Sequence, residues 1–275
     1  MTKATQGTDA WHRLPVPTPP PAKGFRLMMR VIWALLMLEI TSRYGRYAVG
    51  VIWALVEPAL LILFFAVVFT FVRVHSGADV VPFLLCGIAL VLMFRSTAGR
   101  VISGFKSIRG LLGLVQVQIL DGLIAYTLVE APKWVLVIVI TNSVAILLGL
   151  SYWPDDGMAC LLVLLGVVAM SLSWGMIMGA LITIFPLLAT PNSIVNRLWF
   201  FASGTFYSID VVPEPLRTYL LYNPLLHYVE IGRAGFAGTA LPEGVSPGYP
   251  VFVTLGMLAW GLILERNART IRRRA

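Results

Sequence analysis

Residues 158–186 read MACLLVLLGVVAMSLSWGMIMGALITIFP, an apolar block without a single charged side chain. The block is longer than the roughly 20 apolar residues that cross the hydrocarbon core of a bilayer as a helix, so it can also cross at a tilt. Gly175 and Gly179 lie four residues apart within it and permit close packing of a neighbouring helix. In a chain with several spans, such a pair is more often an internal contact than a dimer face.

The composition of the whole chain agrees with this membrane-spanning block. Hydrophobic residues make up 58% of the 275 residues and charged residues only 12%, against about 25% charged residues in a soluble domain. These values exclude a soluble enzyme, a disordered chain and an ordinary nucleic-acid module. Cys86 and Cys160 lie in apolar blocks and are interpreted as small core residues.

The remaining apolar blocks predict an all-α polytopic membrane protein with six transmembrane helices. The predicted spans are about 50–72, 82–105, 134–150, 158–186, 197–212 and 246–264. The fifth is marginal for a full crossing, and the Asn223-Pro224 pair interrupts the stretch that follows it. We therefore expect short re-entrant helices over 213–238, where protein or a water-filled cavity can bury the broken backbone.

The two ends of the chain differ from this membrane domain, which we place at 25–265. Residues 1–24 predict a flexible proline-rich arm, and 266–275 form a basic tail. Residues 25–47 mix apolar and charged side chains and predict an amphipathic helix in the cytoplasmic interface. The alternative is a first transmembrane helix that tolerates Glu39.

Basic residues gather at both ends of the chain and account for much of its net charge of +8. By the positive-inside rule both termini are cytoplasmic, which requires an even number of spans. The opposite loops carry six of the 13 acidic residues, with Arg73 and Arg217 as basic exceptions: Asp79, Asp155, Asp156, Asp210, Glu214 and Glu243. The sequence thus predicts a multi-pass protein and no nucleic-acid partner.

No motif for catalysis, metal binding or ATP binding is present in the sequence. Residues 99–107 approach a phosphate-binding loop, but Phe105 displaces the lysine and the context is a membrane helix. The three histidines are isolated, so no metal site is expected. We predict no catalytic residue and no cofactor in this chain, so any ATP used for transport must be hydrolysed by another subunit.

Three charged residues inside predicted spans are candidates for a structural or a transport role. Glu57, next to Pro58, either supports a kink through a local ion pair or serves transport. Arg95 and Arg100 either line a path for an anionic cargo or extend to the cytoplasmic headgroups. Arg95 lies deeper and is the better path candidate.

Aromatic residues cluster around the fifth span and after it. The path candidates among them are Trp199, Phe206, Tyr207 and Tyr222. Composition alone favours an interfacial aromatic belt. The alternative is a surface on which sugar rings stack.

Several of these residues together resemble the membrane subunits of type-2 ABC exporters, most closely the capsule polysaccharide permeases of the KpsM type. The resemblance begins with Glu39-x-x-x-Arg43-Tyr44-Gly45, Gly50, Trp53 and Glu57-Pro58, and later includes Asn223-Pro224-Leu225, His227, Glu230 and Arg233. It covers the chain from about residue 27 to the tail. Arg95 stands where this family commonly has a small polar residue.

The resemblance implies a homodimer that works with two ATP-binding subunits, which hold ATP and Mg. It also implies an interface helix before the first span and a coupling helix at about 106–118 that meets the ATPase. The coupling candidates are Lys106, Ile108, Arg109, Leu112 and Gln116, and the structural polar candidates are Glu39, Arg43, Glu57, Pro58, Asn223, Glu230 and Arg233.

We therefore predict the permease subunit of an ATP-driven exporter that moves a lipid-linked capsular polysaccharide across the bacterial inner membrane. A periplasmic co-polymerase and an outer-membrane exporter are further candidate partners. The same architecture could export O-antigen or teichoic acid. A drug or small-lipid exporter, a stand-alone carrier and a membrane glycosyltransferase are the remaining alternatives.

Overall fold

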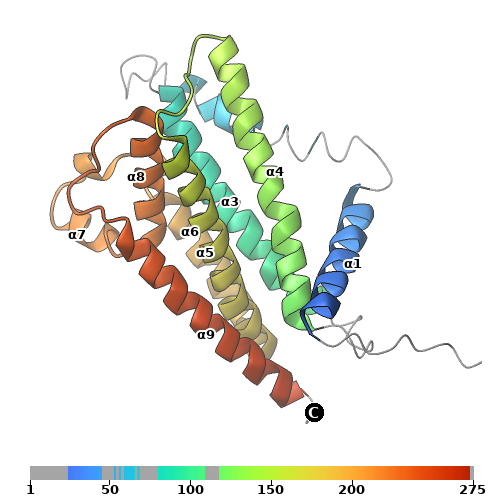
Figure 1. Cartoon of the computed structure of the whole chain (residues 1–275). Coiled ribbons are helices and arrows are strands. Elements are labelled where there is room, and N and C mark those ends of the chain that lie inside the picture. The colour runs from blue at the N-terminus through green and yellow to red at the C-terminus, as the bar shows by residue number, and fades with distance from the viewer. Residues whose placement is uncertain are drawn as a thin grey trace, which may run out of the picture.

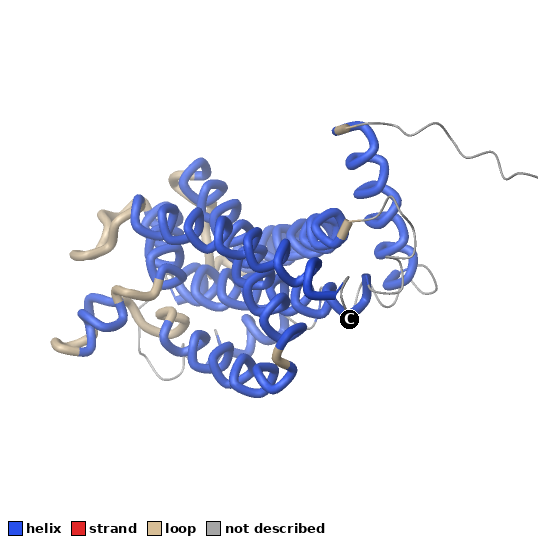
Figure 2. Tube along the Cα trace, turned by 90° about the horizontal axis from the view of Figure 1, so that it is seen from below, coloured by secondary structure: helices blue, strands red, loops and turns tan. Residues whose placement is uncertain are grey.

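The computed structural model describes residues 24–44, 53, 56, 59–65, 67–68, 80–108 and 118–272. Every regular element within these ranges is a helix, as the tube in Figure 2 shows. The predicted all-α class is confirmed for this part of the chain. The predicted first span, 50–72, lies largely outside it, and so does most of the connection predicted as a coupling helix.

Four of the described helices are long and apolar enough to cross a membrane. They are α3 (Val80–Ser107), α4 (Ile119–Leu147), α5 (Gly157–Ile184) and the Gly248–Asn267 part of α9 (Gly248–Arg272). The predicted spans 82–105, 158–186 and 246–264 fall on α3, α5 and α9. The chain is therefore a multi-pass membrane protein, and the count of six spans stays a prediction.

Helix α5 is the centre of the bundle and packs against α3, α9 and the shorter α8 (Pro224–Ala237). A Cβ atom on Gly175 would lie 2.5 Å from Cβ of Val101, and one on Gly179 would lie 2.4 Å from the Phe105 ring. The two glycines therefore let α3 approach α5 closely. This glycine pair makes the internal contact that the sequence favours.

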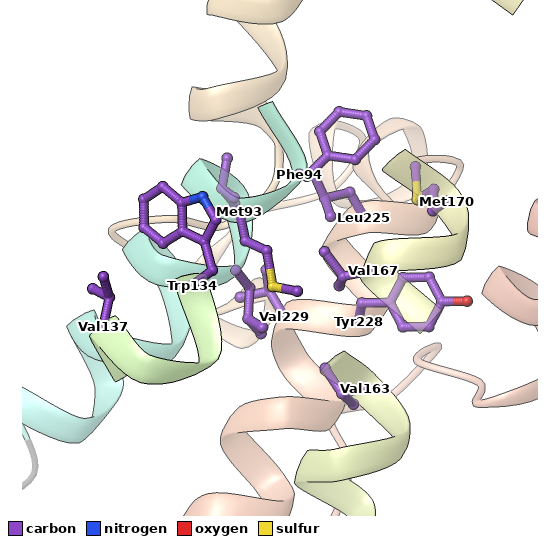
Figure 3. Packing of buried hydrophobic residues seen from close by; sticks show 12 residues of the cluster. Met93, Phe94, Trp134, Val137, Val163, Val167, Met170, Leu225, Tyr228 and Val229 are labelled. Atoms are coloured by element: carbon purple, nitrogen blue, oxygen red, sulfur yellow. The ribbon is translucent and has the colours of Figure 1, made fainter. Parts of the chain in front are cut away.

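One hydrophobic cluster joins α8 to the long helices, as Figure 3 shows. Phe94 of α3, Trp134 of α4 and Val167 of α5 pack around Leu225 and Val229 of α8. Leu225 and Val229 are fully buried. The short α8 is thus part of the core of the bundle.

Helix α4 begins well before residue 134, where the sequence places the start of its span. Asp121 at the third helical position caps the first turn and accepts a hydrogen bond of 3.3 Å from the Gln118 N–H. Asp121 and Glu130 interrupt the apolar pattern but are buried. The helix therefore extends through polar residues that a hydropathy profile treats as an end.

Helix α1 (Phe25–Tyr44) lies beside the first half of α4, at the end of the bundle where α9 finishes (Figure 1). A Cβ atom on Gly122 of α4 would lie 3.7 Å from the Leu35 side chain. Glu39 is only 6% exposed. The helix thus packs against the bundle through one side, and its position in the membrane interface stays a prediction.

The helical part of the predicted fifth span is shifted toward the N-terminus. Helix α6 runs over Ala189–Ala202 and follows a 3-10 turn, η3, at Pro186–Leu188. It ends before Gly204, whose φ of +68° an L side chain rarely adopts. Residues 203–212 therefore form a turn and the short η4 (Ile209–Val211).

The stretch 213–238 is broken, as the sequence predicts, into α7 (Leu216–Leu220) and α8. Pro224 occupies the first turn of α8, where its missing N–H costs nothing. Helix α7 and the loops around it lie at the end of the bundle opposite the C-terminus (Figure 1). Whether these two helices are re-entrant in a membrane stays a prediction.

Candidate functional site

A buried ion pair on α8 holds the turn that follows α6. Arg233 Nη1 lies 3.1 Å from Glu230 Oε1, and both side chains are almost completely buried. The Arg233 guanidinium also donates to three carbonyl oxygens of the turn 204–207 at 2.6 to 3.2 Å, and to the Phe83 carbonyl at 3.3 Å. Glu230 accepts the N–H of Ile209 at 3.0 Å. One charge pair thus joins α8, α3 and the turn.

Asn223 connects the same turn to the start of α8. Its Oδ1 accepts the N–H of Leu225 at 3.0 Å and so caps the helix. Its Nδ2 donates to the Ala202 carbonyl at 3.1 Å and to the Ser203 hydroxyl at 2.9 Å. The structural polar candidates Asn223, Glu230 and Arg233 therefore act together on one short segment.

His227 holds the segment that leads into α9. Its Nδ1 accepts the N–H of Ser246 at 3.1 Å, so the neutral ring carries its proton on Nε2. That Nε2–H donates to the Leu221 carbonyl at 2.8 Å. The histidine is thus a connector between loops at the α7 end of the bundle.

The aromatic path candidates divide between the core and the loops. Trp199 packs on Phe94 with ring centroids 4.9 Å apart and on Trp174 at 4.7 Å. Phe206 lies in a separate group and contacts Phe200 at 5.5 Å and Phe65 at 4.8 Å.

The two tyrosine candidates lie in different surroundings. The Tyr207 hydroxyl donates to the Phe201 carbonyl at 3.0 Å. Tyr222 is 71% exposed, and its carbonyl accepts the Tyr249 hydroxyl at 2.8 Å. Of the aromatic candidates, Phe206 and Tyr207 lie together, whereas Trp199 and Tyr222 are separate from them.

Arg95 and Arg100 have different neighbours although both lie on α3. Arg100 forms an ion pair with Glu39 of α1, and its guanidinium lies 4.5 Å from the centre of the Tyr126 ring. Arg95 lies 5.5 Å from the centre of the Phe200 ring and forms no ion pair with any described residue. Arg100 therefore joins α3 to α1, whereas Arg95 stays a path candidate without an ion pair among the described residues.

Sequence reasoning missed a buried charge pair near the middle of α4. Glu130, 2% exposed, forms an ion pair with Lys133 and accepts a hydrogen bond from Ser96 of α3. The available signal was the Glu-x-x-Lys spacing, which places two opposite charges on one helix face. The pair lies in a long helix, so it links α4 to α3 inside the bundle.

The coupling candidates are described only in part. Lys106 is exposed in the last turn of α3, and Ile108 is fully buried against Gly122. Arg109, Leu112 and Gln116 lie outside the described residues, as do Glu57, Pro58 and the side chain of Arg43. In the part of the chain that the structure describes, no three His, Cys, Asp or Glu side chains form a group that could hold a metal ion.

Several proteins of known name are similar to this chain over most of its length. The capsule polysaccharide export inner-membrane protein CtrC of Neisseria meningitidis serogroup A is 29% identical over 86% of this chain and 90% of its own. The corresponding protein BexB of Haemophilus influenzae is 27% identical over 86% of this chain and 91% of its own. The polysialic acid transport protein KpsM of Escherichia coli is 27% identical over 89% of this chain and 95% of its own.

A protein family also matches the segment that contains most of the residues described above. Residues 30–237 match the family described as ABC-2 type transporter. This range includes the Glu39–Arg100 pair, α3 to α6, and the cluster of Asn223, Glu230 and Arg233. It also covers well over half of the chain. The chain therefore belongs to the ABC-2 type transporter family.

Proposed function

We propose that this protein is the membrane permease subunit of an ATP-driven exporter that carries a lipid-linked capsular polysaccharide across the bacterial inner membrane. The observation that carries the proposal is the near full-length similarity to CtrC, BexB and KpsM. Since no ATP-binding motif occurs in the sequence, ATP and Mg belong to a separate subunit.

The proposed assembly is a homodimer of this chain with two ATP-binding subunits. Each copy crosses the membrane six times, with the region 50–72 and the α6 segment as the two spans besides α3, α4, α5 and α9. Both termini are cytoplasmic because Arg266, Arg269 and Arg272 follow the last span and the first 50 residues are also basic. A periplasmic co-polymerase and an outer-membrane exporter receive the polymer.

The proposed coupling route starts at α1 and at the connection 106–118. The Glu39–Arg100 ion pair ties α1 to α3, and α1 packs along the first half of α4. A push on α1 by the ATPase would therefore move α3 and α4 together. Exposed Lys106 suits contact with an acidic ATPase surface, and Arg109, Leu112 and Gln116 extend that contact.

The proposed cargo path runs beside α3 and α6. Arg95 supplies a positive charge for an acidic polymer, and in a medium of low dielectric one such charge has a strong effect. Phe206 and Tyr207 supply aromatic faces further along. The ion-paired Arg100 belongs to the coupling route instead.

At the other end of the bundle, α7 and α8 form a re-entrant element around the exit of the path. The Glu230–Arg233 pair supports this assignment because it fixes the turn 204–207 against α8 and α3. That turn carries Phe206 and Tyr207. A displacement of α8 would therefore move these two aromatic side chains.

The first experiment purifies the tagged full chain from its native membranes in mild detergent and identifies what accompanies it. We expect a near-stoichiometric protein with a phosphate-binding loop. Absence of such a protein in several detergents, with the chain still monodisperse, would contradict the exporter assignment.

A second experiment tests the cargo by deleting the gene and measuring surface and intracellular polysaccharide. We expect capsule to disappear from the surface and to accumulate inside the cell, and the wild-type gene to restore export. Loss of O-antigen or teichoic acid with intact capsule would keep the exporter and replace its cargo.

A further inference from the structure

A groove between α5, α8 and the start of α9 lies on the opposite side of α5 from the small-residue contact with α3. It encloses about 610 Å³. Its walls are mainly apolar and include Leu162, Val163, Ile231 and Val251. Leu162 and Val251 are 60% and 47% exposed, so the groove is open at the side. Neither the coupling route nor the cargo path uses it.

The groove has the depth of one leaflet of a bilayer. It extends along α5 from Asp156 to Gly166. At 1.5 Å per residue this is about 15 Å, and half of a hydrocarbon core is also about 15 Å. A groove of this depth fits an acyl chain that stands upright in the leaflet.

The inner end of the groove is closed by an aromatic ring. Tyr228 of α8 lies against Gly166, where a Cβ atom would be 2.3 Å from the ring. The Tyr228 hydroxyl lies 3.2 Å from the Thr254 hydroxyl, at hydrogen-bond distance. Since the hydroxyl already has a partner, the ring is suited to the end of an apolar chain rather than to a polar group.

The outer end carries two carboxylates in a fixed position. The N–H groups of Asp155 and Asp156 donate to the carbonyls of Phe236 and Gly235 at 3.2 and 2.8 Å. The Asp156 side chain accepts the N–H of Ala159 at 2.9 Å. Neither carboxylate forms an ion pair with another described residue. Two negative charges thus stand at the mouth of an apolar groove.

We propose that this groove binds a phospholipid with a primary ammonium headgroup, such as phosphatidylethanolamine. The acyl chain occupies the apolar walls down to Tyr228, and the ammonium group donates hydrogen bonds to Asp155 and Asp156. An anionic lipid would meet the same two carboxylates with like charge.

A transmembrane helix of a partner protein is the competing occupant. The two carboxylates at the mouth favour an occupant that places a cation next to an apolar chain, and a lipid with an ammonium headgroup combines both. The groove volume of about 610 Å³ also lies within the roughly 300–1,000 Å³ of small-molecule sites.

The test uses the tagged full chain, purified in mild detergent, stripped of lipid and then incubated with equimolar phosphatidylethanolamine and phosphatidylglycerol. Native mass spectrometry measures the lipid retained. We expect phosphatidylethanolamine to exceed phosphatidylglycerol about tenfold, which corresponds to about 1.4 kcal/mol. Val251→Trp fills the groove and abolishes this excess, and the double variant Asp155→Asn, Asp156→Asn brings the ratio close to one.

Matched variants separate the groove from the general surface. Phe252→Trp changes the neighbouring exposed residue of α9 and leaves retention unchanged. If Val251→Trp does not fold, Leu162→Trp replaces it, with Leu165→Trp as the control, since Leu165 is 58% exposed and lies outside the groove. Equal retention of both lipids by the wild type, or an unchanged ratio in the double aspartate variant, overturns the proposal. The proposal is also overturned if the groove-filling variant retains lipid as the wild type does but loses a co-purifying protein, because the groove would then bind that protein.

Discussion

Arg233 uses each of its five N–H donors on a protein acceptor. Nε donates to Phe83, and the two terminal nitrogens donate to Glu230 and to the carbonyls of the turn 204–207. Lysine could not reproduce this pattern because its three donors leave from one point. The residue therefore acts through geometry as much as through charge.

We expect Arg233→Gln to lower the free energy of unfolding by about 3–5 kcal/mol, since Glu230 would remain buried without its counter-charge. The measurement is the unfolding midpoint of the purified chain in one detergent, followed by tryptophan fluorescence. Arg217→Gln is the control, because the Arg217–Asp210 pair is 3.6 Å long and the Arg217 hydrogen bond to the Glu243 carbonyl is exposed; that variant should cost about 1 kcal/mol. Equal midpoints for the two variants would refute the structural role of Arg233.

The two arginines of α3 should respond differently to the same substitution. Arg95→Gln removes the unpaired charge, and we expect export of an acidic polymer to fall about tenfold, or about 1.4 kcal/mol, with the ATPase still bound. Arg100→Gln removes the ion pair with buried Glu39, which costs about 1–3 kcal/mol in stability. Surface polysaccharide and co-purified ATPase are measured in both strains. Normal export by Arg95→Gln would remove Arg95 from the cargo path.

At the scale of the element, α5 depends on two positions without side chains. Gly179 lies against Phe105 of α3, so a side chain there would push the two helices apart. On α9, Gly256 has open space around its Cβ position, with no atom within 4 Å. The same residue type is thus required at one site and replaceable at the other.

We expect Gly179→Val to destabilise the chain by about 1–3 kcal/mol through overpacking and to lower its melting temperature by roughly 2–4 °C per kcal/mol. Gly256→Val should leave the melting temperature unchanged. Thermal unfolding of both variants in the same detergent tests this pair. A comparable loss in Gly256→Val would show that β-branching, rather than contact with Phe105, is responsible.

The sequence predicts elements well where an apolar run ends at a strong signal. Asp156 caps the start of α5 and Pro186 follows its end, so the predicted span 158–186 and the helix Gly157–Ile184 nearly coincide. Prediction is poorer at α6, because Asn192, Asn196 and Arg197 make part of it polar, whereas the predicted span runs on through 203–212, where the α-helix has ended. Hydropathy measures how readily a segment partitions into a membrane, but it does not indicate where a helix ends. Here the helix ends just before the turn at Gly204.

The candidate site also contains residues that the sequence identifies and contacts that it does not predict. The resemblance to the exporter family singles out Asn223, Glu230 and Arg233 from the sequence, and the structure shows that all three contact the turn after α6 or the residues next to it. The Glu39–Arg100 pair joins residues 61 positions apart. No periodicity predicts such a contact, because it depends on how α1 docks against the bundle.

At the scale of the whole molecule, the sequence separates its basic and acidic residues. The first 50 residues and the tail are basic, whereas Asp155, Asp156, Asp210, Glu214 and Glu243 lie in the opposite connections. Figure 1 places α7 and the loops near it far from the C-terminus. The charge distribution therefore predicts one cytoplasmic and one periplasmic end.

We expect a phosphatase reporter that works only outside the cytoplasm to be active when inserted after Trp153 and inactive at the C-terminus. Fluorescent protein fusions should give the reverse pattern. Activity in colonies measures the first, and whole-cell fluorescence the second. A phosphatase signal at the C-terminus would place this end outside the cytoplasm and would contradict the proposed topology.

The shortness of α6 has a consequence for the energetics of moving a polyanion. Its 14 residues rise about 21 Å, whereas the hydrocarbon core is about 30 Å thick. In the proposed six-span arrangement, this hydrophobic mismatch leaves roughly a third of the core thickness beside α6 to turns and short helices that carry hydrogen-bonding backbone. A polymer that follows α6 would thus meet a thinner insulating layer than the bilayer itself presents. The electrostatic self-energy barrier for each charge of the polymer would therefore be lower, even without contacts between side chains and sugars.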